Sequence, residues 1–125
     1  MNKYDPEQPL NSNSWLSLSE DDRINLAMES HDSSDLFEQS LTLHASIHVV
    51  VENQLALNTE YVPETLTALI KQGMSRHDAV HAIGAVVLEE LLQVRENGES
   101  FNSKQYKKRF GDLIKGGGRP FDYGN

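Results

Sequence analysis

The chain contains no cysteine among its 125 residues. This absence excludes a disulfide framework and every metal site that is built on thiolate ligands. A metal ion would therefore have to be held by imidazole and carboxylate groups alone. A chain without cysteine also suits a reducing compartment, so we expect a cytoplasmic protein.

Basic residues are scarce. The 11 lysine and arginine residues are outnumbered by 19 aspartate and glutamate residues, and the net charge is −8. Because nucleic acids and anionic membranes attract basic surfaces, we expect neither as a partner. The one basic cluster is interpreted as the solvated face of a helix. It consists of Lys104, Lys107, Lys108, Arg109, Lys115 and Arg119.

Long hydrophobic runs are also missing. No window is long and apolar enough to span a bilayer, and residues 1–14 lack the apolar stretch of a signal peptide. A chain of this length builds one hydrophobic core. We predict a flexible N-terminal arm over residues 1–14 and a helical core domain over residues 15–95. A short basic helix and a mobile glycine-rich tail follow over residues 96–125.

Apolar residues recur at the spacing of helices, and no segment alternates as a strand does. Capping boxes predict helix starts at Ser17, with Ser19 as a second register, and at Ser75. Pro63 suits the first turn of a helix, and Gly73 suits its left-handed cap. The predicted helices cover about residues 17–31 or 19–31, 35–57, 63–72, 75–95 and 103–114. The sequence therefore predicts an all-α protein, a small four- to five-helix bundle with flexible termini.

Four of the five histidines form two His-x-x-x-His pairs, His44 with His48 and His77 with His81. The spacing places both rings of a pair on one helix face, about one turn apart. Each pair lies on a stripe of apolar residues, so all four imidazoles are expected to be buried. Two such helices, packed side by side, would present four nitrogens to one point. Gly84, one turn after the second pair, would let a neighbouring helix approach closely.

Buried imidazoles need partners, because an unpaired buried polar group costs about 1–3 kcal/mol. Three accounts stay open at this point. The first is ligation of a metal ion, and the second is hydrogen bonding to carboxylates or backbone. The third is a metal-free cleft in which His48 or His81 acts as a general base.

Carboxylates near the histidines favour the metal account, because such groups fix histidine tautomers and strengthen ligation. Glu52 lies one turn after His48 and is predicted as a ligand or as support for one. A second tier of candidates consists of His31, Glu29 and Asp78. Imidazole with carboxylate suits zinc, iron, nickel or copper, so the predicted cofactor is one transition-metal ion.

Several segments resemble a family of short bacterial helical proteins that is grouped as a domain of unknown function. The likeness is carried by His44 and His48 with Glu52-Asn53-Gln54, and by Arg76-His77-Asp78-Ala79-Val80-His81-Ala82-Ile83-Gly84. Trp15-Leu16 and Glu20-Asp21-Asp22-Arg23-Ile24 are similar to the opening of the family. The resemblance covers about residues 15–95 and implies a compact helical domain without an established activity. It also implies that His31 closes the first helix, whereas Asp32 departs from the basic residue of the pattern.

The leading hypothesis is a small helical protein that binds a transition metal through His44, His48, His77 and His81. The alternative is a non-enzymatic interaction or regulatory module in which the buried histidines are structural. The sequence contains neither the His-Glu-x-x-His motif of metalloproteases nor a glycine-rich phosphate loop. It therefore assigns no reaction, and enzyme activity, a small-molecule ligand and homo-oligomerisation stay open.

Overall fold

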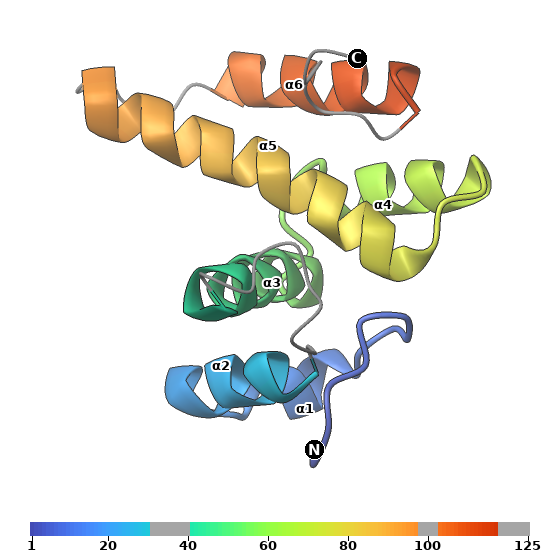
Figure 1. The fold of residues 1–125 in the computed structure, drawn as a ribbon. Helices are drawn as coiled ribbons and strands as arrows, with labels where there is room; N and C mark the ends of the chain where they lie inside the picture. The colour runs from blue at the N-terminus through green and yellow to red at the C-terminus, as the bar shows by residue number, and fades with distance from the viewer. Residues whose placement is uncertain (31–40, 98–102, 118–125) are drawn as a thin grey trace.

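A computed structural model describes residues 1–30, 41–97 and 103–117. Within these residues the chain forms six α-helices and no strand, which confirms the predicted all-α class (Figure 1). The helices are α1 (Ser12–Leu16), α2 (Glu20–Glu29), α3 (Leu41–Ala56), α4 (Val62–Lys71), α5 (Arg76–Asn97) and α6 (Ser103–Lys115). None of these described helices is long and apolar enough to cross a membrane.

The helix boundaries follow the capping signals. Ser19 caps α2, where its hydroxyl accepts a hydrogen bond from the amide of Asp22 at 3.1 Å. Ser75 precedes α5 and accepts from the amide of Asp78 at 3.1 Å. Gly73 has a φ of +100°, and its amide and the next one close α4 in a Schellman motif. Local hydrogen bonding therefore sets these ends much as the sequence predicts.

Some predicted elements need adjustment or lie outside the described residues. The sequence did not predict α1, a single turn of five residues capped by Asn11. The second predicted helix was expected to begin at residue 35, and the described part of α3 begins at Leu41. Residues 31–40, and residues 118–125 of the predicted tail, lie outside the described part of the chain.

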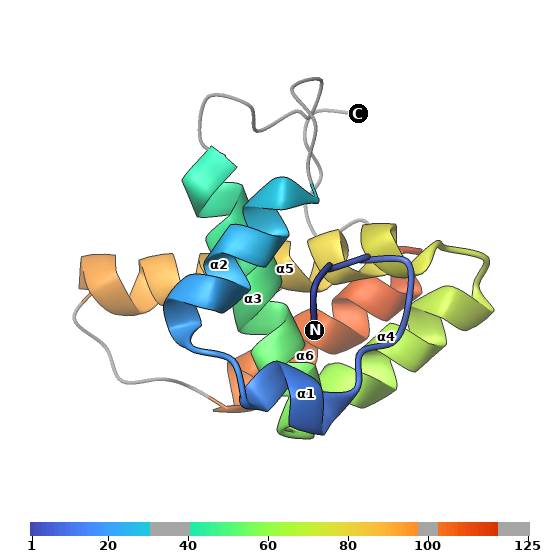
Figure 2. The same cartoon turned by 90° about the horizontal axis from the view of Figure 1, so that it is seen from below.

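The helix α3 lies at the centre of the bundle. On one side it packs against α1 and α2, and on the other side it crosses α5 (Figures 1 and 2). The helices α4 and α6 pack against α5. The two helices that carry the histidine pairs are therefore direct neighbours.

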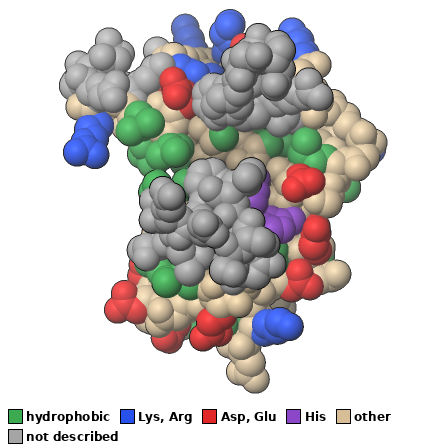
Figure 3. Space-filling model, viewed as in Figure 1, with side chains coloured by type: hydrophobic (Ala, Val, Ile, Leu, Met, Phe, Trp, Pro, Cys, Tyr) green, Lys and Arg blue, Asp and Glu red, His purple; other side chains and the backbone are tan. Residues whose placement is uncertain are grey.

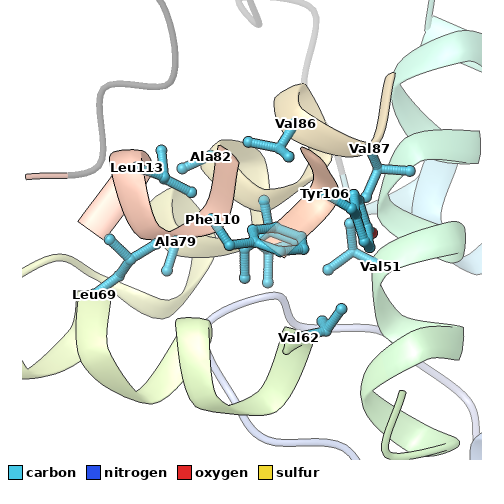
Figure 4. Packing of buried hydrophobic residues seen from close by; sticks show 12 residues of the cluster. Val51, Val62, Leu69, Ala79, Ala82, Val86, Val87, Tyr106, Phe110 and Leu113 are labelled. Atoms are coloured by element: carbon cyan, nitrogen blue, oxygen red, sulfur yellow. The ribbon is translucent and has the colours of Figure 1, made fainter. Parts of the chain in front are cut away.

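Two hydrophobic clusters share α3. The larger cluster joins α3 to α4, α5 and α6 (Figure 4). The smaller cluster joins α3 to the N-terminal segment, α1 and α2. Its buried members are Tyr4, Trp15, Ala27, Ala45 and Val49. Because both clusters cover α3, polar side chains on this helix are buried as well.

The core reaches beyond the predicted limits of 15 and 95 in both directions. Tyr4 is only 1% exposed and Pro6 is buried, so the segment predicted as a flexible arm is docked on the bundle. At the other end, Tyr106, Phe110 and Leu113 of α6 belong to the larger cluster. Aromatic rings at both ends bury large apolar areas, which explains why these segments join the core.

The basic cluster lies largely on the outer face of α6. The lysines are exposed while the apolar residues of the helix are buried, as expected for a solvated helix face. These lysines are Lys104, Lys107, Lys108 and Lys115. Arg109 instead forms an ion pair with Glu90 of α5, and Arg119 lies outside the described residues.

Gly84 makes the crossing of α3 and α5 narrow. A Cβ atom built on Gly84 would lie 2.4 Å from Cγ2 of Ile47 and 3.7 Å from Cγ2 of Val51. The first distance is shorter than two carbon atoms tolerate. The close helix approach predicted from this glycine is therefore confirmed, and it occurs one turn from His81.

We expect the substitution Gly84→Ala to lower the free energy of unfolding. The clash costs about 1–3 kcal/mol, whereas the better helix propensity of alanine offsets at most about 1 kcal/mol. Urea denaturation would measure the difference. The matched control is Gly111→Ala in α6, where an added Cβ meets no atom within 4 Å and should stabilise. Equal stabilisation by both substitutions would contradict the described crossing.

Candidate metal centre

Three imidazoles from α3 and α5 converge where the two helices cross. His44 and His48 are buried, at 2% and 0% exposure, and His81 is partly buried. Nε2 of His81 lies 2.7 Å from Nε2 of His44 and 2.7 Å from Nε2 of His48. One nitrogen from each ring lies within 4.8 Å of the others. In the part of the chain that the structure describes, this is the one group with the geometry of a metal site.

The site reaches the surface of the molecule. Figure 3 shows histidine atoms at the surface near the middle of the bundle, beside acidic side chains. This view agrees with the partial exposure of His77 and His81 on α5. Water can therefore approach the imidazoles from the α5 side, while α3 closes the site from within.

Hydrogen bonds between the rings do not by themselves account for the geometry. In the plane of an imidazole, each nitrogen carries either one hydrogen or one lone pair. Nε2 of His81 therefore makes one linear hydrogen bond, yet two ring nitrogens lie 2.7 Å away from it. Three lone pairs that share one cation would remove this conflict.

His77 lies at the edge of the group. Its ring centroid is 4.3 Å from that of His81 and 5.1 Å from that of His48. Its backbone amide, in the first turn of α5, donates a hydrogen bond to Oε1 of Glu7 at 3.0 Å. The structure thus brings all four predicted histidines together, and the nitrogens of three of them converge.

Glu52 is linked to the three histidines through Tyr4, which contacts both Glu52 and His48. It lies on α3 at 1% exposure, and Arg76 donates to Oε2 at 2.8 Å and to Oε1 at 2.9 Å. Tyr4 donates to Oε2 at 2.5 Å. A carboxylate that already accepts from three donors is poorly placed to ligate a metal. Of the two roles predicted for Glu52, its contacts favour support.

Burial and charge hold the side chains of Tyr4 and Arg76 in defined protonation states. Burial raises the pKa of the Tyr4 hydroxyl, and the charge and hydrogen bond of Glu52 raise it further. Burial alone would lower the pKa of Arg76, but the hydrogen bond and charge of Glu52 outweigh this effect and raise it. Tyr4 therefore stays a neutral phenol, and Arg76 stays a cation.

The hydrogen bonds of Tyr4 indicate the tautomer of His48. Tyr4 has one proton, which it donates to Glu52, and its oxygen keeps only lone pairs for other partners. That oxygen lies 3.0 Å from Nδ1 of His48, so Nδ1 must carry the hydrogen. Nε2 then presents a lone pair toward His81. This is the tautomer in which histidine ligates a metal through Nε2.

A second network anchors α1 and α2 beside Glu52. Oδ1 of Asn53 accepts hydrogen bonds from Nε1 of Trp15 at 2.8 Å and from Nη1 of Arg23 at 3.1 Å. Arg23 also donates to the carbonyl oxygens of Trp15 and Leu16. The ring centroid of Trp15 is 5.6 Å from that of Tyr4. Tyr4, which contacts His48, therefore packs against a Trp15 ring that is held by its hydrogen bond to Asn53.

Two of the three second-tier candidates, Glu29 and Asp78, do not belong to the group of converging nitrogens. Glu29 is exposed at the end of α2, and Asp78 is exposed with its amide bonded to Ser75. His31 lies outside the described residues. Asp78 does not support the neighbouring His77 because adjacent residues on a helix point about 100° apart.

Sequence reasoning missed Tyr4 and Arg76. The signal for Tyr4 is a lone aromatic residue in a polar segment, which favours docking because such a ring is costly to leave in water. The signal for Arg76 is a cation that directly precedes the buried stripe of α5, while Glu52 requires a partner on α3. The contacts themselves join residues that are distant in the sequence, and spacing does not reveal them.

Comparison of the chain with known protein families, with curated proteins and with solved structures finds no match. The site is therefore interpreted from its own geometry and chemistry.

Proposed function

We propose that this chain binds one transition-metal ion through Nε2 of His44, His48 and His81. The observation that carries the proposal is the convergence of three ring nitrogens at the crossing of α3 and α5. Two of the rings are buried, and the hydrogen bond of His48 to Tyr4 directs its Nε2 lone pair toward the same point. Imidazole nitrogen is a preferred ligand of zinc, copper, iron and nickel.

The spacing of the nitrogens fits such an ion after a small adjustment. Ligands at about 2.0–2.1 Å from a tetrahedral ion lie about 3.3 Å apart. The contacts to His81 are 2.7 Å, and all three nitrogens lie within 4.8 Å of one another. Opening the two short contacts by about half an ångström would reach the tetrahedral spacing.

The chemistry of the site depends on what completes the coordination. Three protein ligands and an open position for water are typical of catalytic metal sites, whereas four protein ligands are typical of structural ones. His81 is partly exposed, which favours access of water. The ring of His77 lies beside that of His81, at a centroid distance of 4.3 Å, but its nitrogens do not belong to the converging group.

Metal titration of the apo-protein tests the proposal. The protein would be produced without a polyhistidine tag, stripped with chelator, and titrated with zinc, copper, iron and nickel. We expect one ion per chain for at least one metal. At 100 times the Kd, the bound ion should add about 2.7 kcal/mol to the free energy of unfolding. Chelator should reverse the gain.

The contrary result is metal far below one ion per chain, together with a Tm that no metal or chelator changes. The three imidazoles would then serve as hydrogen-bonding groups in the core. That outcome would favour the interaction module that the sequence left open.

A further inference from the structure

The N-terminal segment, residues 1–10, contacts the histidine site at three points. Tyr4 contacts His48 and Glu52, the carbonyl of Pro6 accepts from Arg76 at 2.9 Å, and Glu7 accepts from the amide of His77. No helix holds these ten residues in place, since α1 begins at Ser12. Their docking therefore depends on packing in the smaller cluster and on hydrogen bonds, and their described hydrogen bonds to α3 and α5 are all made with the site.

Tyr4 is the most buried of these contacts. It is 1% exposed, its ring packs on Trp15, and it forms a T-shaped pair with the ring of His48 at a centroid distance of 5.8 Å. Its hydroxyl is the only group of the segment that joins Glu52 to His48 in the described structure. Without that hydroxyl, Nδ1 of His48 would lose the oxygen that favours hydrogen on this nitrogen.

We infer that Tyr4 is a positioning residue of the metal centre, so that docking of the N-terminal segment and metal binding strengthen each other. The inference rests on the proposed function. Arg76 holds Glu52, Glu52 accepts from Tyr4, and Tyr4 accepts from Nδ1 of His48. This chain keeps a lone pair on Nε2 of His48, where the metal requires it.

The coupling is reciprocal by thermodynamic necessity. If the docked segment raises metal affinity, bound metal must stabilise the docked segment by the same factor. The fraction of molecules in which residues 1–10 are docked would then depend on whether the site holds metal. Opening of residues 1–10 is expected to be rare in the metal-loaded protein and more frequent in the apo-protein.

The test compares Tyr4→Phe with the wild type. Phenylalanine keeps the ring and removes the hydroxyl, so we expect metal affinity to fall about 10- to 100-fold, the usual effect of losing a partner behind a ligand. The matched control is Tyr106→Phe, which removes a buried tyrosine hydroxyl in the other cluster. This control should bind metal as the wild type does.

Two further measurements separate positioning from a merely structural role. Nitrogen NMR of the apo wild type should show hydrogen on Nδ1 of His48, and Tyr4→Phe should show a mixture of tautomers. Amide exchange of residues 3–5 and 7 should slow when the wild type binds metal, and less so in Tyr4→Phe.

Several outcomes would overturn the inference. They are unchanged metal affinity in Tyr4→Phe, hydrogen on Nε2 of His48 in the wild type, or amide exchange of the N-terminal segment that is the same with and without metal. The tautomer of His48 in the wild type tests the inference even if Tyr4→Phe does not fold. A wild type that binds no metal at all would instead end the proposed function, whatever the tautomer of His48.

Discussion

Replacement of His81 by alanine is expected to abolish tight metal binding. Nε2 of His81 is the atom that contacts the nitrogens of both His44 and His48, so its loss leaves two ligands on one helix. We expect an affinity loss greater than the roughly 100-fold upper effect of removing a supporting partner. Competition with a chromophoric chelator would measure it. The apo form of His81→Ala should still fold, because this side chain is partly exposed.

The control for His81→Ala is His77→Phe, a substitution one turn earlier on α5. Phenylalanine retains ring packing against His81 and His48, and it removes both nitrogens. We expect metal affinity close to that of the wild type. An equal loss in both variants would show that His77 is a ligand, as the sequence predicted. Wild-type affinity in His81→Ala would contradict the assignment of the site.

Replacement of Arg76 by leucine is expected to destabilise the fold by about 3–5 kcal/mol, because it leaves a charged carboxylate buried without its counterion. The side chain of Glu52 is 0% exposed, and that of Arg76 is 8% exposed. Arg76 also donates to the carbonyl of Pro6, so residues 1–10 lose one anchor. Urea denaturation of the apo-protein would measure the loss. Such a loss is a large share of the stability of a typical domain.

The double substitution Arg76→Leu with Glu52→Gln is the matched control. Glutamine removes the negative charge and keeps an oxygen that accepts from Tyr4. We expect the double variant to recover at least part of the stability lost by Arg76→Leu alone. If Arg76→Leu unfolds at the same urea concentration as the wild type, the buried ion pair is not formed as described.

Much of the fold could be predicted from the sequence, because its determinants are local. The hydroxyls of Ser19 and Ser75 bond within their own turns, and Gly73 adopts the left-handed conformation that ends α4. Gly84 likewise marks a helix crossing through its missing side chain. The docking of residues 1–10 was not predicted, because its one local signal is Tyr4 and its contacts with α3 and α5 join residues that are distant in the sequence.

The candidate site could be predicted in part for the same reason. Helical spacing places His44 above His48 on α3, and their apolar neighbours indicate burial. The spacing does not show which ring nitrogens converge between the two helices. The crossing of α3 and α5 at Gly84 determines this. It also does not reveal that the oxygens of Glu52 are already engaged by Arg76 and Tyr4.

X-ray absorption spectroscopy of the metal-loaded protein tests the central claim most directly, because it counts the imidazoles bound to the ion. The account predicts three imidazole ligands, with metal–nitrogen distances of about 2.0–2.1 Å if the ion is zinc. The count should fall to two in a sample of His81→Ala loaded at excess metal. A spectrum with oxygen ligands alone, or with one imidazole at most, would contradict a metal centre formed by His44, His48 and His81.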